Sequence, residues 1–123
     1  APAPLRILLI DDEAPVRRAL ADAFAVLGHA VVEAGSGREG LLRLERGERV
    51  DIVITDLGMP GMTGWDVAHE IRMRWPDLPV GLVTGWVSGS ELNPEEVGRV
   101  AFVIAKPYTL DSLDAALALV RPS

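Results

Sequence analysis

Five short apolar runs alternate with segments of helical periodicity along this chain, and this alternation limits its fold more than any other feature. The runs cover residues 5–10, 30–32, 51–55, 79–83 and 101–105. Continuous apolar runs of this length are typical of strands that are covered on both faces of a sheet. Strands that alternate with helices through short connections predict an α/β fold, in which a five-stranded parallel sheet carries helices on both faces.

Capping residues mark where helices begin. Ser36 and Thr109 precede two helical segments and are predicted to act as their N-caps. The segment 86–100 is the weakest part of the pattern, because Gly98 interrupts a helix about one turn after its start at Pro94. We therefore predict that this segment is the least regular part of the fold.

The composition indicates a single domain without disulfide bonds or membrane-spanning segments. The chain has 123 residues, of which 49% are hydrophobic, and it has no cysteine. No apolar run approaches the roughly 20 residues of a membrane span, and no charged segment followed by an apolar one marks a signal peptide. The net charge of −6 argues against direct nucleic-acid binding by this chain. We expect a cytoplasmic protein without membrane contact, with residues 5–121 as its domain and residues 1–4 as a linker or cloning remnant.

Polar residues follow four of the predicted strands. They are Asp11 and Asp12 after the first run, Asp56 after the third, Thr84 after the fourth and Lys106 after the fifth. Ligands of parallel sheets bind beyond the carboxyl ends of the strands, so these side chains are expected to meet in one crevice. Neighbouring carboxylates repel one another, and a bound cation or covalent capping of one carboxylate relieves the repulsion. The arrangement favours a site that binds a cation and accepts a phosphoryl group on Asp56.

The same residues lie in four short motifs that together resemble a known family. The motifs are Ile10-Asp11-Asp12-Glu13, Thr55-Asp56-Leu57-Gly58-Met59-Pro60, Val83-Thr84-Gly85 and Ala105-Lys106-Pro107-Tyr108. In this order and at strand ends, they resemble the receiver domain of two-component response regulators, of the chemotaxis-regulator type. The resemblance covers residues 5–120 and implies a flavodoxin-like strand order of 2-1-3-4-5.

The resemblance implies a phosphoacceptor and a metal site. Asp56 would take a phosphoryl group from a phosphohistidine on a histidine kinase or a phosphotransfer domain. Mg²⁺ or Mn²⁺ would be held by Asp12, Asp56 and the backbone carbonyl of Gly58, while Asp11 would hold a metal-bound water. These roles agree with the chemistry, because Mg²⁺ takes oxygen ligands and keeps several waters. Phosphoryl transfer itself depends mainly on positioning and charge neutralisation.

The resemblance also assigns the two remaining strand-end residues to the phosphoryl group. Lys106 would place a positive charge near its oxygens, and Thr84 would donate a hydrogen bond. Gly85 has no side chain to block the approach, and a cis peptide bond between Lys106 and Pro107 is expected to direct the lysine into the crevice. Trp86 is expected to lean over the phosphoryl group and slow its hydrolysis, with an outward-facing interface role as the alternative.

One departure from the family pattern bears on switching. Many receivers have an aromatic residue three positions before the lysine, and this residue swings inward when the threonine moves. The chain has Val103 there, and the neighbouring Phe102 should face the opposite side of the strand. The valine argues against an aromatic rotamer switch.

Enzyme and cofactor-binding alternatives fit less well. A haloacid-dehalogenase-type phosphatase needs a second aspartate two residues after the nucleophile, and position 58 is glycine. A flavodoxin-like cofactor site needs a phosphate loop rich in serine, threonine and glycine, whereas the first loop carries Asp11, Asp12 and Glu13. We expect no enzyme activity beyond the chain's own phosphorylation and dephosphorylation. A degenerate receiver that serves only for protein docking remains an alternative.

The two histidines are not expected to take part in phosphoryl transfer. His29 and His69 have no carboxylate at a useful spacing, so both are expected on the surface and neither as a phosphohistidine donor.

The chain is expected to be a receiver module of a hybrid histidine kinase in a phosphorelay, with a stand-alone single-domain regulator as the alternative. A weak homodimer is a further expected interaction.

Overall fold

A computed structural model describes residues 3–85 and 94–120 and shows a five-stranded parallel sheet in the order β2-β1-β3-β4-β5. The predicted fold class and strand order are therefore confirmed. The strands are β1 (Arg6–Ile10), β2 (Ala30–Ala34), β3 (Ile52–Asp56), β4 (Val80–Thr84) and β5 (Phe102–Ala105). The helices are α1 (Ala14–Val26), α2 (Gly37–Glu45), α3 (Gly64–Arg74), α4 (Pro94–Val97) and α5 (Leu110–Ala118). Among these helices, none has the length and the apolar character needed to cross a bilayer.

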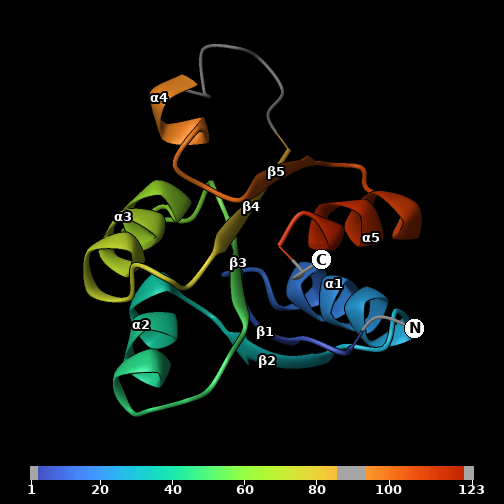
Figure 1. The fold of residues 1–123 in the computed structure, drawn as a ribbon, viewed down its shortest axis with the longest axis horizontal. Coiled ribbons are helices and arrows are strands. Elements are labelled where there is room, and N and C mark those ends of the chain that lie inside the picture. The colour runs from blue at the N-terminus through green and yellow to red at the C-terminus, as the bar shows by residue number, and fades with distance from the viewer. Residues whose placement is uncertain (1–2, 86–93, 121–123) are drawn as a thin grey trace.

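Helices cover both faces of the sheet, with α1 and α5 on one side and α2 and α3 on the other (Figure 1). Side chains of a strand alternate between the two faces, and β1 contributes to both cores. Ile7 and Leu9 pack in the core beneath α1 and α5, whereas Leu8 and Ile10 pack in the core beneath α2 and α3. All four are at most 1% exposed, so the strand that leads into the acidic pair is fixed from both sides.

Side-chain caps fix where the helices begin. The Ser36 hydroxyl accepts a hydrogen bond from a backbone amide in the first turn of α2, and Thr109 takes part in a reciprocal capping box at the start of α5. Both predicted caps are confirmed. The helix α4 is a single turn that begins at Pro94, in agreement with the predicted break at Gly98. Residues 86–93 of the same predicted segment lie outside the described residues.

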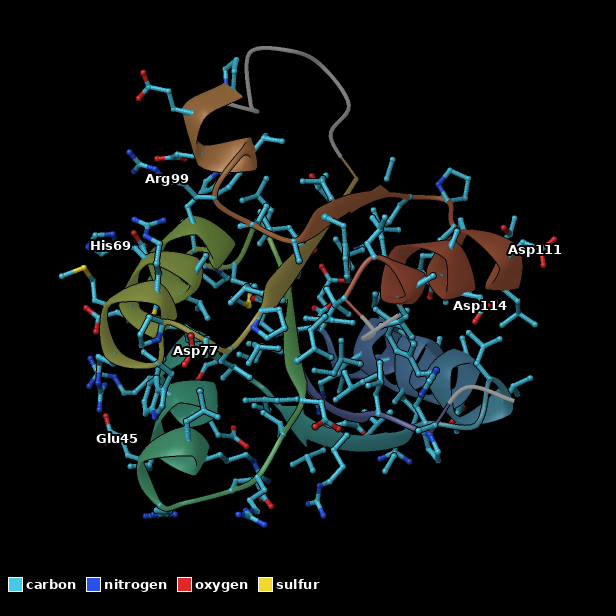
Figure 2. All side chains as sticks on the ribbon, viewed as in Figure 1. Glu45, His69, Asp77, Arg99, Asp111 and Asp114 are labelled. Atoms are coloured by element: carbon cyan, nitrogen blue, oxygen red, sulfur yellow. The ribbon has the colours of Figure 1, made fainter. Side chains whose placement is uncertain are left out.

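The two histidines lie in different environments, and the surface prediction for His29 is wrong. Its side chain is buried, and its Nδ1 accepts a hydrogen bond from the Leu5 backbone N–H at 2.9 Å. The imidazole thus provides a partner for a backbone donor just before β1, and the spacing of carboxylates in the sequence cannot reveal such a contact. His69 is exposed on the outer side of α3, as predicted (Figure 2).

The aromatic ring of Phe102 lies over Gly81 of the adjacent strand. The two residues are directly opposite one another in the register of β4 and β5, and a Cβ atom at position 81 would clash with the ring. Phe102 and Ile104 belong to the core beneath α1 and α5, so Val103 faces the other side of the strand, as predicted. The close approach of the ring is the reason for glycine at this position.

Gly81→Ala should lower the free energy of unfolding by about 1–3 kcal/mol, because the added methyl group would be forced into the Phe102 ring. Urea unfolding measures this change. Gly98→Ala is the matched control, since a Cβ atom there would lie 3.6 Å from its nearest neighbours. When Gly81→Ala is combined with Phe102→Leu, the two losses should not add. Full stability of Gly81→Ala would contradict the requirement for glycine.

Candidate functional site

Three carboxylates from two neighbouring strands meet at the carboxyl edge of the sheet. Asp11 and Asp12 follow β1, Asp56 ends β3, and one oxygen from each carboxylate lies within 4.8 Å of the others. The parallel pairing of β1 with β3 brings both strand ends to the same edge. The three acids that the sequence places at neighbouring strand ends therefore lie together at this edge of the sheet.

Asp11 is buried and held by its neighbours. Only 3% of its surface is exposed. Its backbone N–H donates to the Ala34 carbonyl at 3.1 Å, and its Oδ1 accepts from the Glu13 backbone N–H at 2.9 Å. Burial raises the pKa of the Asp11 carboxyl above its ordinary value, the hydrogen bond from Glu13 opposes this rise, and repulsion from Asp56 adds to it. Asp12 is exposed, so the cluster opens to solvent on that side.

A lysine just after β5 contributes a positive charge to the acidic cluster. Lys106 Nζ lies 3.4 Å from Asp56 Oδ1 in a partly buried ion pair. The Lys106 backbone N–H donates to the Thr84 carbonyl at 2.8 Å, which ties the ends of β4 and β5 together. The Lys106–Pro107 peptide bond is cis, as predicted. The lysine offsets part of the negative charge that the three acids bring to this edge.

The remaining predicted residues lie around the same edge or outside the described ranges. Thr84 ends β4 and is 1% exposed. Gly85 follows in an exposed position, where a Cβ atom would meet nothing within 4 Å. Gly58 is exposed in the loop after β3. Trp86 lies outside the described residues, and its shielding role stays a prediction from the sequence.

The helix α3 begins close to the end of β3, and Gly64 makes this approach possible. A Cβ atom at Gly64 would lie 2.6 Å from the Asp56 carbonyl oxygen, so a larger residue does not fit. Thr63 and Asp66 then form a capping box, in which each side chain accepts a hydrogen bond from the other residue's backbone N–H. Asp56 is thus followed by a loop that is fixed where it enters α3. The sequence motifs end before Gly64 and do not reveal this contact.

Arg17 is a further residue of the site that the strand-end pattern does not reveal. From α1, its Nη1 donates to the Asp11 carbonyl oxygen at 2.8 Å, and its Nε donates to Glu33 Oε1 at 2.9 Å. The available signal is its helical position, because Arg17 shares a face with Ala21 and Phe24, both of which are buried. A charged residue on the inward face of a helix indicates a partner within the fold.

The donor set of the acidic cluster suits a hard divalent cation. Its members are carboxylates, and Mg²⁺ takes carboxylate oxygens while keeping several of its waters. Asp11 is buried and Asp12 is exposed, so the cluster is anchored on one side and accessible to water on the other.

Comparisons with known proteins point to one protein family. The family model of the response regulator receiver domain matches residues 7–118. The response regulator MprA of Mycolicibacterium vanbaalenii is 34% identical over 119 residues, which cover 96% of this chain and 51% of MprA. A probable transcriptional regulator, ycf27 of Porphyridium aerugineum, is 33% identical over 91% of this chain and 46% of its own length. The chain therefore spans about half the length of these curated relatives.

Solved structures show the same fold. The chemotaxis protein CheY4 of Vibrio cholerae has a TM-score of 0.84 at 26% identity, covering 96% of this chain and 99% of CheY4. The response regulator TrrA of Thermotoga maritima, in complex with Mg²⁺-BeF, has a TM-score of 0.84 at 29% identity, covering 94% of this chain and 97% of TrrA. TrrA has also been solved in complex with the histidine kinase ThkA. The acidic cluster fits the magnesium site of a receiver domain.

The raised pKa of Asp11 predicts that its charge destabilises the cation-free fold at neutral pH. The folded chain holds this proton more tightly than the unfolded chain does, so the contribution to stability is present below the ordinary pKa of 3.8 and is lost as the pH rises through the raised value. Asp11→Asn should therefore raise the free energy of unfolding at pH 7 in EDTA, and this gain should disappear in strong acid.

Urea unfolding at several pH values tests this prediction. Asparagine retains an oxygen that can accept the Glu13 N–H, so the substitution removes the charge while keeping the hydrogen bond. Asp22→Asn, on the exposed side of α1, is the control and should change little. A lower stability of Asp11→Asn at pH 7 would show that the charge does not oppose folding.

Proposed function

Because this chain belongs to the response regulator receiver domain family, we propose that Asp56 accepts a phosphoryl group from a phosphohistidine of a histidine kinase or phosphotransfer domain. One observation carries this proposal: the carboxylates of Asp11, Asp12 and Asp56 lie within 4.8 Å of one another, with Lys106 Nζ 3.4 Å from Asp56. Phosphoryl transfer to an aspartate uses three parts: a carboxylate nucleophile, a fixed positive charge and flanking acids that hold a cation.

In the proposed transfer, an oxygen of the Asp56 carboxylate attacks phosphorus while the P–N bond to the imidazole breaks. The bonding electrons stay with the imidazole nitrogen, and the product is an acyl phosphate on Asp56. Thr84 ends β4, and Lys106 follows the neighbouring strand β5. Lys106 would present a positive charge to the phosphoryl oxygens, and Thr84 would present a hydroxyl donor. Attack of water on phosphorus would later restore the carboxylate and release phosphate.

The acidic cluster supplies the proposed metal ligands. Asp12, Asp56 and the backbone carbonyl of Gly58 would hold Mg²⁺ or Mn²⁺, whose charge would neutralise the phosphoryl oxygens during transfer. Asp11 would orient a coordinated water. This assignment agrees with its contacts, since the Glu13 N–H bonds Oδ1 of Asp11 and no hydrogen bond among the described residues goes to its second oxygen.

The output of the switch is proposed to lie on the surface formed by α4, β5 and α5. The hydrogen bond between the Lys106 N–H and the Thr84 carbonyl connects the end of β4 to the segment between β5 and α5. A change at the phosphoryl group can therefore reach this surface through two adjacent strand ends. The proposal also includes a weak homodimer. It further includes a cytoplasmic location.

The chain is proposed to be a receiver module of a hybrid histidine kinase, with a stand-alone regulator as the alternative. The relatives MprA and ycf27 favour a third arrangement, in which the receiver is one part of a longer response regulator. One of them is named a response regulator and the other a probable transcriptional regulator, and each is about twice as long as the region that this chain matches. The ThkA–TrrA complex supports a histidine kinase as partner in all three. The complete coding sequence of the gene distinguishes these arrangements.

Asp56→Asn should abolish phosphoryl incorporation while the fold survives, because asparagine keeps the shape of the side chain but is a poor nucleophile. The chain is incubated with Mg²⁺ and phosphoramidate, and the added phosphate is measured by mass spectrometry. Asp77→Asn, in the turn before β4 (Figure 2), is the control and should react like the wild type. Phosphate on the Asp56→Asn variant at a comparable rate would refute the assignment. A wild type that gains no phosphate would favour the degenerate docking receiver.

Mg²⁺ should raise the melting temperature of the wild type, because a ligand that binds only the folded chain stabilises it. At about ten times the dissociation constant the gain is about 1.4 kcal/mol, or about 5 °C for a domain of this size. Thermal denaturation with and without MgCl₂ measures the gain, which should shrink in Asp12→Ala. An equal gain in both proteins would remove Asp12 from the metal site.

A further inference from the structure

Arg17 links three parts of the molecule that meet beside the acidic cluster. It belongs to α1, its Nη1 donates to the Asp11 carbonyl oxygen at 2.8 Å, and its Nε donates to Glu33 Oε1 on β2 at 2.9 Å. The Arg17 and Glu33 side chains are 18% and 26% exposed. In such a partly buried pair, the planar guanidinium holds its partners in a more fixed geometry than an exposed lysine or arginine does.

The carbonyl that Arg17 holds belongs to the peptide unit between the two aspartates of the site. Because a peptide unit is planar, the C=O of Asp11 and the N–H of Asp12 must turn together. The other contacts of Asp11 act on different groups, since its N–H donates to Ala34 and its carboxylate accepts from Glu13. Arg17 therefore bonds directly to the peptide unit that leads to Asp12.

We propose that Arg17 is a positioning residue for the metal ligands of this site. It orients Asp12 through the Asp11–Asp12 peptide, and Glu33 in turn orients Arg17. The hydrogen bond from Arg17 goes to a backbone carbonyl and does not occupy a carboxylate oxygen of the acidic pair. This role rests on the proposed function, because it concerns the binding of Mg²⁺ by the acidic cluster.

The neighbouring residue Arg18 provides a matched control. Arg18 Nε lies 3.3 Å from Glu33 Oε2, so both arginines contact the same carboxylate. The Arg18 side chain is 70% exposed, whereas Arg17 alone of the two donates to the Asp11 carbonyl among the hydrogen bonds of the described residues. Substitution of either arginine by methionine removes one positive charge and one contact with Glu33. Only Arg17→Met also releases the peptide between the aspartates.

Titration of the full chain with MgCl₂, followed by the NMR shifts of backbone amides, tests the proposal. This measurement gives the dissociation constant and shows whether each variant is folded. Arg17→Met should weaken Mg²⁺ binding by about 10-fold, the lower end of the range for losing a group that orients metal ligands. Arg18→Met should stay within about 2-fold of the wild type, as expected for an exposed ion pair.

Two further variants separate geometry from charge and from loss of the fold. Glu33→Gln keeps Arg17 but weakens its anchor, and its affinity for Mg²⁺ should fall between those of the wild type and Arg17→Met. Arg17→Lys keeps the positive charge but cannot bond two partners with one planar fork, so it should not restore binding. The free energy of unfolding in EDTA is measured in parallel, because a purely structural role would lower stability without changing the affinity of the folded chain.

The outcomes separate this proposal from the proposed function. Wild-type affinity in Arg17→Met, or full recovery in Arg17→Lys, would overturn the positioning role. If Arg17→Met does not fold, wild-type affinity in both Glu33→Gln and Arg17→Lys would overturn it as well. A wild type without saturable Mg²⁺ binding would instead overturn the proposed metal site, and the role of Arg17 with it.

Discussion

Repulsion among three carboxylates at one edge of the sheet is the interaction on which the site depends. It follows from topology, because β1 and β3 are adjacent and parallel, and their ends deliver Asp11, Asp12 and Asp56 within 4.8 Å of one another. Like charges at such distances raise the free energy of each ionised group. The fold can hold them there because β1 is buried on both faces, and Lys106 offsets part of the charge.

The sheet could be predicted from the sequence because its strands are buried on both faces and appear as continuous apolar runs. The residues at which the strands end were predicted less accurately, for a physical reason. The third apolar run stops at residue 55, whereas β3 continues to Asp56, which pairs with Val83 in the register of β4. Backbone pairing does not require an apolar side chain, so a strand can extend into the residue that carries the chemistry. The strand-end residues could likewise be placed together, since parallel strands end at one edge.

Contacts between distant parts of the chain were not predictable from spacing. His29 is buried because its ring accepts a hydrogen bond from the Leu5 backbone, 24 residues away. Gly64 is required because α3 starts against the end of β3, and Gly81 because a ring from the next strand lies over it. Each contact depends on how elements pack, and a pattern along one element does not contain that information. Arg17 is the intermediate case, because its inward helical position indicates a partner without identifying it.

Geometry and charge at the acidic site are controlled by different residues. Within residues 3–85 and 94–120, Asp11 bonds the backbone groups of Ala34 and Glu13, and the Arg17 side chain bonds its carbonyl. These contacts fix where the acid lies without forming an ion pair with its carboxylate. Lys106 forms an ion pair instead with Asp56. Asp11 is therefore held in place, and none of the ion pairs among the described residues neutralises its carboxylate. We expect such a site to lower the stability of the cation-free chain, and for the same reason to gain more from a bound cation than a neutralised cluster would.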